Sequence, residues 1–163
     1  MKRLAVHIVV WALLAAAGLF AATRLGAFSG KAPADLGVRD GKLKAPSPTP
    51  NSVSSQAALW PDHPQRAYAE IAPFKLQADA AATLTRLARV VEATAGARIV
   101  ERKPDYLYAQ FTTPLMRYVD DVEFWYDPAA NVIQVRSASR LGHGDLGANR
   151  ARVERLRAAL GAG

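Results

Sequence analysis

The first long pattern in the chain is an almost unbroken apolar run, Leu4–Ala22. At about 1.5 Å per residue, this run makes a helix of roughly 28 Å, close to the thickness of the hydrocarbon core of a bilayer. Lys2 and Arg3 precede the run, and only Arg24 follows it closely. We therefore predict a signal-anchor helix within residues 1–27, with the N-terminus in the cytoplasm and the remaining chain outside.

A cleaved signal peptide is the alternative interpretation of this run, and it would make the protein secreted. Signal peptides have a shorter apolar core and a small-x-small cleavage site. The best late site, Ala21–Thr23, ends in a threonine, which is a poor residue for cleavage. We therefore favour a single-pass protein of the cytoplasmic (inner) membrane whose C-terminal domain faces the periplasm or the cell exterior. A buried core helix would have to be apolar on every face.

Residues 28–66 lack a regular period and are rich in proline and glycine. Ala45–Pro50 alternates proline with small residues, which favours extended polyproline geometry. This composition predicts a semi-rigid spacer that holds the domain away from the bilayer. Asn51–Gln56 is dense in serine and amide side chains, which favour turns, and we expect an ordered loop there, packed on the domain through Val53 and Trp60.

From residue 67 onward, segments of helical period alternate with segments of period two. The predicted elements are a short strand over Tyr68–Ile71, a helix from Asp79 to about Ala95, strands over 97–102, 105–113, 120–127 and 132–140, and a helix from Asp145 or Leu146 to about Leu160. This order predicts an α+β domain over residues 67–163, with two helices packed on one face of an antiparallel sheet of four to five strands.

The segment Pro128–Asn131 predicts a tight hairpin loop, because proline suits the second position of a type I turn and asparagine tolerates the left-handed conformation. A loop of this length sets the register and places Phe124 opposite Val135 and Glu123 opposite Arg136. One face of the hairpin is then apolar and belongs to the core. The other face is polar and carries Asp121, Glu123, Trp125, Gln134 and Arg136.

The composition narrows the chemistry that the chain can perform. It has 163 residues, a formal net charge of +7 and no cysteine, which excludes disulfides, thiolate zinc sites and a cysteine nucleophile. His7, His63 and His143 are scattered without ligand-like spacing, so we predict no metal site and no cofactor. Because a domain outside the membrane does not normally meet nucleic acid, we assign the basic excess to a solvated surface near anionic lipid headgroups.

Four acidic residues lie in the strand predicted over 120–127: Asp120, Asp121, Glu123 and Asp127. Paired carboxylates can serve hydrolysis or bind a hard cation. A hydrolytic enzyme that uses Asp121 and Glu123 with His143 is therefore one hypothesis. We favour the alternative that these acids pair with Arg136 and Arg140 across the hairpin.

The turn Gly142–Gly147 matches the pattern G-x-G-x-x-G between a strand and a helix. A dinucleotide site also needs a second parallel strand and an acidic residue about twenty positions on, and neither follows in this sequence. We predict instead a turn with Asp145 as the helix cap, beside which Arg140 and Arg150 can hold an anion. We expect Arg136, Arg140 and Arg150 to lie close together. The predicted binding residues are Glu123, Arg136, Arg140, Asp145, Asn149 and Arg150.

Several of these segments occur together, in the same order, in a known family. Over about residues 45 to 160 the sequence resembles the family of domain of unknown function 1499. The resemblance implies a mostly bacterial protein, often with a membrane helix or an export signal, and it brings no established activity. The segments that carry it are Pro50–Gln56, Tyr106–Ala109, Thr113–Phe124, Arg136–Arg140, Gly142, Asp145, Gly147, Asn149–Arg150 and Arg152–Glu154.

Three functions remain compatible with the sequence. The first, which we favour, is a membrane-anchored envelope protein whose outward-facing domain binds a ligand or partner, with an anionic ligand or lipid headgroup as the candidate. The second is the hydrolytic enzyme described above, and the third is a purely structural envelope component. No nucleophile, base and orienting group are visible together, which argues against the enzyme. Nothing in the sequence identifies a protein partner.

Overall fold

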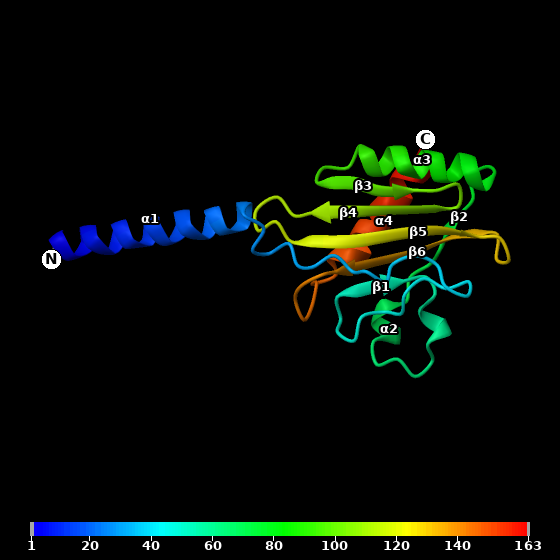
Figure 1. The fold of residues 1–163 in the computed structure, drawn as a ribbon, viewed down its shortest axis with the longest axis horizontal. Helices are drawn as coiled ribbons and strands as arrows, with labels where there is room; N and C mark the ends of the chain where they lie inside the picture. Colours follow the sequence, from blue (N-terminus) through cyan, green and yellow to red (C-terminus); the bar gives the residue numbers. More distant parts are fainter. Residues whose placement is uncertain (1, 163) are drawn as a thin grey trace.

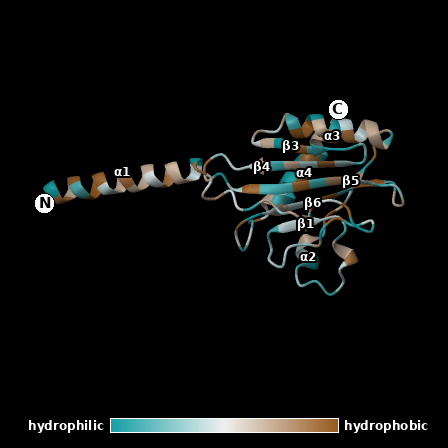
Figure 2. Ribbon diagram, viewed as in Figure 1, coloured by the Kyte–Doolittle hydropathy of each residue, from teal (hydrophilic) through white to brown (hydrophobic). Residues whose placement is uncertain are grey.

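The computed structural model describes residues 2–162, and its first element, α1 (Lys2–Arg24), projects away from the rest of the chain (Figure 1). Within Arg3–Arg24, an 18-residue window has a mean hydropathy of 2.3, and none of that window is buried. Apolar residues follow one another along the whole helix (Figure 2). By length and composition, α1 is therefore long and apolar enough to cross a membrane, as a membrane anchor or a signal sequence is.

The remaining chain forms one antiparallel sheet with helices. In chain order the elements are β1 (Ser52–Ser54), a 3-10 turn (Ala57–Leu59), α2 (Arg66–Ala69), β2 (Phe74–Lys75), α3 (Ala80–Glu92), β3 (Ala97–Arg102), β4 (Tyr106–Thr112), β5 (Val119–Asp127), β6 (Val132–Ser139) and α4 (Ala148–Gly161). The strand order is β1-β6-β5-β4-β3, and β2 pairs with the start of β6. The predicted α+β class is confirmed, although the sheet has six strands because the short β1 and β2 join it.

The main core lies between the sheet and the two long helices, α3 and α4 (Figure 1). Asp79 caps α3 as predicted, because its Oδ1 accepts a hydrogen bond of 2.7 Å from the backbone N–H of Ala82. Leu87 and Val91 of α3 and Val153 of α4 are fully buried against the sheet. These side chains recur at three and four residues along each helix, which is why one face of each helix is covered.

The predicted hairpin register is confirmed residue by residue. Asp127 pairs with Val132, Phe124 with Val135, and Glu123 with Arg136. Phe124 and Val135 are both fully buried. Since a slip of one residue would turn both side chains outward, the loop length and the alternation of side chains together determine which residues face the helices.

The strand predicted over Tyr68–Ile71 is wrong. The one-turn helix α2 extends into the first half of this segment, and the strand β2 begins only after Pro73. The carbonyl groups of this region are bound by α4 and not by a strand ladder. Arg150 donates to the carbonyls of Tyr68 and Glu70, at 2.6 and 2.8 Å. Arg157 donates in the same way to the carbonyls of Ala72 and Pro73, each at 2.7 Å.

The predicted spacer is also different in the structure. We call residues 31–48 the strap, because they run along the face of the sheet opposite α3 and α4 (Figure 1). Leu43 of the strap is 1 % exposed and packs with Tyr106, Tyr108 and Trp125 of the sheet. The backbone N–H of Gly37 also donates to Glu123, at 2.7 Å. The strap is not a simple extended spacer, because it turns back on itself at Arg39–Lys42 and its apolar side chains pack on the sheet.

Candidate functional site

The strap covers four of the charged side chains that the sequence singles out. Asp121 and Glu123 come from β5, Arg136 comes from β6, and Arg140 follows β6 directly. They share one face because side chains alternate along a strand, so that residues two and four positions apart point the same way. Asp121 pairs with Arg140 and Glu123 with Arg136, so the predicted pairing across the hairpin is confirmed for these two acids. It is wrong for the other two, because Asp120 pairs with an arginine of α4 and Asp127 accepts hydrogen bonds from its own loop and from Gln134.

Glu123 is the most enclosed of these groups, with no exposed surface. Its Oε1 accepts hydrogen bonds from Gly37 N, at 2.7 Å, and from the Tyr106 hydroxyl, at 2.8 Å. Its Oε2 accepts none and lies 3.8 Å from Arg136 Nη1. Burial raises the pKa of Glu123, and burial lowers the pKa of Arg136, since each charge has lost its water. The pair is therefore a buried electrostatic contact.

Asp121 and Arg140 form a closer pair at the edge of the strap. Arg140 Nε and Nη2 donate to the two carboxylate oxygens at 2.8 and 2.7 Å, and the Tyr108 hydroxyl donates to Asp121 Oδ1 at 2.5 Å. The hydrogen bonds from Arg140 to Asp121 raise the pKa of Arg140. The Asp121 carboxylate therefore accepts three hydrogen bonds from the guanidinium and the phenol. These bonds leave few oxygen lone pairs for a substrate.

The start of α4 is occupied by Asp145. Its carboxylate accepts hydrogen bonds from the backbone N–H groups of Gly147, at 3.0 Å, and Asn149, at 2.9 Å, and from the Tyr68 hydroxyl. Burial acts in the opposite direction, but these hydrogen bonds lower the pKa of Asp145. Asp145 therefore binds N–H groups at the helix start, as predicted, but the N-cap position itself is Gly147 and not Asp145. The N–H groups that an anion would use are therefore already bound by the protein's own carboxylate.

The three arginines that we expected together are divided between two parts of the structure. Arg136 and Arg140 line one hollow of about 230 Å³ at the edge of the strap, with Lys31 and Lys44. Arg150 points instead to the carbonyls beside α2. The role of these residues in ligand binding stays a prediction.

A buried polar network on the helix side of the sheet escaped the sequence reasoning. Arg152 of α4 pairs with Asp120 and donates to Asn149 Oδ1 at 2.7 Å and to Ser137 Oγ at 3.0 Å. Asn149 is completely buried and also donates to the carbonyl of Asn51, at 3.0 Å. The signal for it was the spacing of three between Asn149 and Arg152, which puts both side chains on the buried face of the helix.

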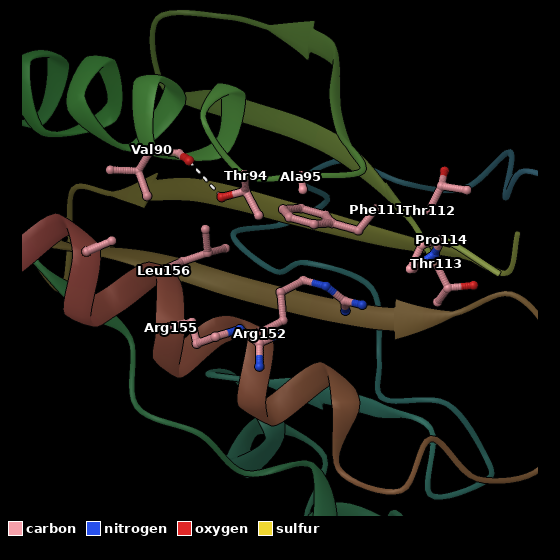
Figure 3. A pocket seen from close by; sticks show the side chains of 11 residues that line it. Val90, Thr94, Ala95, Phe111, Thr112, Thr113, Pro114, Arg152, Arg155 and Leu156 are labelled. Carbon is pink, nitrogen blue, oxygen red and sulfur yellow. Dashed lines mark hydrogen bonds between the residues drawn. The ribbon is translucent and has the colours of Figure 1, made fainter.

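A cavity of about 360 Å³ lies beside this network, between α3, α4 and the end of β4 (Figure 3). Arg152 extends along one wall, with its guanidinium carbon 5.0 Å from the centre of the Phe111 ring. Arg155 also lines the cavity and, within residues 2–162, forms no ion pair with an acid. The other lining residues are Val90, Thr94, Ala95, Thr112, Thr113, Pro114, Leu156 and Ala159.

Among the described residues, no group of three or more His, Cys, Asp or Glu side chains is placed to hold a metal ion.

Comparison with known proteins identifies the family. A search of curated proteins and a search of solved structures each found no match. Residues 42–160, well over half of the chain, match the family described as "Protein of unknown function (DUF1499)", and the protein belongs to that family.

Proposed function

We propose that this protein is a membrane-anchored binding domain without catalytic activity, and that the cavity between α3 and α4 takes a small amphipathic anion. The observation that carries the proposal is the composition of that cavity. Its walls are largely apolar, with Val90, Phe111 and Leu156, while Arg155 supplies a positive charge that no acid among the described residues neutralises. Such a combination fits a ligand with a hydrophobic body and an acidic group, because sites of this type use a few polar groups to orient a mostly apolar ligand.

The two arginines contribute in different ways. Arg152 is already neutralised by Asp120 and serves mainly as a rigid wall over Phe111. Arg155 is exposed and has no acidic partner among the described residues, so its guanidinium is available to the ligand. An ion pair with an arginine as exposed as this one contributes up to about 1 kcal/mol. We therefore assign recognition of the acidic group to Arg155.

The hydrolytic alternative has less support. Asp121 is held by Arg140 and Tyr108, and Glu123 is enclosed beneath the strap. No hydrogen bond or ion pair among the described side chains joins His143 to either acid. A hydrolase that works through paired carboxylates needs a carboxylate that can reach both substrate and water.

The ligand test uses the full chain in detergent micelles and native mass spectrometry. The probes are 4-phenylbutanoate and its neutral counterpart 4-phenylbutan-1-ol. We expect an adduct with the acid only, and we expect Arg155→Gln to weaken it about two- to fivefold. Arg89→Gln is the matched control, since Arg89 is an exposed arginine of α3 outside the cavity lining. Equal binding of acid and alcohol, or an unchanged adduct in Arg155→Gln, would contradict the proposal.

The anchoring is tested separately. Alkaline phosphatase fused to the C-terminus should be active, because this reporter folds only outside the cytoplasm, and the fusion should remain in the membrane pellet after extraction at alkaline pH. Release into the supernatant would mean that α1 is cleaved as a signal sequence. An inactive fusion would mean that the domain lies in the cytoplasm.

A further inference from the structure

Exposed apolar side chains gather at the end of the domain from which α1 departs. Outside α1, seven large apolar side chains of the described residues are exposed, and only Leu59 and Val100 lie elsewhere on the domain. Leu25 directly follows α1. We call the other four the apolar rim, which consists of Leu115 (70 % exposed), Tyr118 (38 %), Leu141 (41 %) and Leu146 (105 %).

The rim comes from two loops that lie side by side. Leu115 and Tyr118 belong to the connection between β4 and β5, and Leu141 and Leu146 belong to the connection between β6 and α4. Tyr118, Leu141 and Leu146 line a shared hollow of about 260 Å³ between the loops. Figure 1 shows the first of these loops beside the end of α1. The rim is therefore one surface.

Contacts tie this surface to the chain that leaves α1. The Phe28 ring lies edge-on to Tyr118, with 5.6 Å between the ring centres. Gly30 packs so closely on the side chains of Arg140 and Leu141 that a Cβ atom would come within 3.1 Å of either one. Even fully extended, the six residues from Leu25 to Gly30 span at most about 20 Å. A bilayer that contains α1 therefore lies within reach of the rim.

Two further features single out this end of the domain. Leu146 is fully exposed although its φ is +52°, in the left-handed region that bulky side chains avoid. A leucine kept in this strained, unpacked position indicates a role outside the packing of the domain itself. Arg24, Lys31 and Arg117 lie in or beside the same segments, and none of the three pairs with an acid among residues 2–162.

We propose that the apolar rim inserts into the headgroup region of the bilayer that α1 spans, on the side where the domain lies, while the three basic residues contact lipid phosphates. Apolar side chains flanked by basic ones bind in this way to the boundary between headgroups and acyl chains, and tyrosine favours the same depth. This inference rests on the anchoring proposed above and is independent of the ligand cavity.

The absence of cysteine makes a direct test possible, because each single-cysteine variant of the full chain carries one fluorophore. We would label Leu146→Cys and Leu115→Cys on the rim, Leu59→Cys and Val100→Cys as exposed apolar controls, and Leu14→Cys within α1. All variants go into nanodiscs of phosphatidylcholine and phosphatidylglycerol, three to one. Quenching is measured with a doxyl group placed high on the lipid acyl chain.

We expect the rim positions to be quenched at least about twofold more than Leu59→Cys and Val100→Cys, because the rim lies within roughly 5–10 Å of the acyl boundary. Leu14→Cys should be quenched in every case. Quenching at Leu14→Cys without quenching at the rim would overturn the inference and leave the anchoring intact. A lack of quenching at Leu14→Cys would overturn both, and equal quenching at the rim and control positions would overturn the inference alone.

Discussion

Replacing Arg136 with methionine tests the electrostatics beneath the strap. The Arg136 side chain is 4 % exposed and the Glu123 side chain is fully buried, so removal of the guanidinium leaves a carboxylate with neither water nor counter-charge. Breaking a buried pair from one side costs about 3–5 kcal/mol. This is a large part of the 5–15 kcal/mol that is typical of a whole domain, so Arg136→Met should be close to unfolding at neutral pH.

The pH dependence of this cost identifies its origin. Burial already raises the pKa of Glu123 above its ordinary value of 4.5, and loss of Arg136 raises it further. Between 4.5 and that raised pKa, folded Arg136→Met holds a proton that the unfolded chain lacks, so its free energy of unfolding falls as the pH rises through this window. The penalty should therefore be smaller at about pH 5 than at about pH 7.5. The difference is about 1.4 kcal/mol for each pH unit, within this range, by which loss of Arg136 raises the pKa of Glu123.

The double variant Glu123→Gln/Arg136→Met supplies the control. Glutamine keeps an oxygen for Gly37 N and the Tyr106 hydroxyl, and no charge remains to be buried. Its free energy of unfolding should come within about 2 kcal/mol of the parent. We would measure urea unfolding of the full chain in detergent micelles, through the fluorescence of the buried Trp125. A penalty for Arg136→Met that is below about 1 kcal/mol, or that is equal at both pH values, would refute the reasoning.

Three smaller perturbations follow from other parts of the fold. Asp145→Asn should flatten the acid limb of the stability curve, since the lowered pKa of Asp145 contributes stability that is present above 3.8 and is lost as the pH falls through the folded-state pKa; unchanged unfolding profiles in acid urea would contradict this. Gly96→Ala should cost about 1–3 kcal/mol in thermal unfolding, because φ is +79° and a Cβ would lie 2.4 Å from the carbonyl oxygen of Thr112; an unchanged Tm would show that the turn relaxes freely. Leu146→Asn should relieve backbone strain of up to about 1 kcal/mol, since asparagine tolerates the left-handed conformation; lower stability in micelles would mean that contacts of the leucine, with the domain or with detergent, outweigh this strain.

Sequence periodicity predicted the parts of the fold that depend on local order. The hairpin of β5 and β6 follows from alternation and a four-residue loop, and α3 follows from its stripe and the Asp79 cap. The helix α4 begins at Ala148, which is three residues after the predicted start at Asp145, or two after Leu146. It begins later because Leu146 and Gly147 both have a positive φ, which is not a helical conformation. No local pattern reports such a conformation at a leucine.

The features that the sequence missed depend on long-range contacts. The sequence of the strap predicts a spacer because prolines dominate its local pattern. Its docking depends instead on contacts of Leu43 and Gly37 with side chains far along the chain. The pairs Glu123–Arg136 and Asp121–Arg140 were predicted, because both partners of each pair lie in or directly beside one hairpin. The cavity between α3 and α4 was not predicted, because Phe111 and Arg155 approach only after both helices have packed on the sheet.

The strand order has a consequence for how the protein reaches its folded state. The first strand of the chain, β1, pairs with the last, β6, and Gly37 bonds to a residue 86 positions later. Because a chain is synthesised from its N-terminus, the strap and β1 emerge before their partners in the sheet. The hairpins of β3 to β6 can form as soon as they emerge, because their contacts are local. The strap, although it comes early in the chain, is thus the last segment to dock, and until then the face of the sheet that it covers stays open.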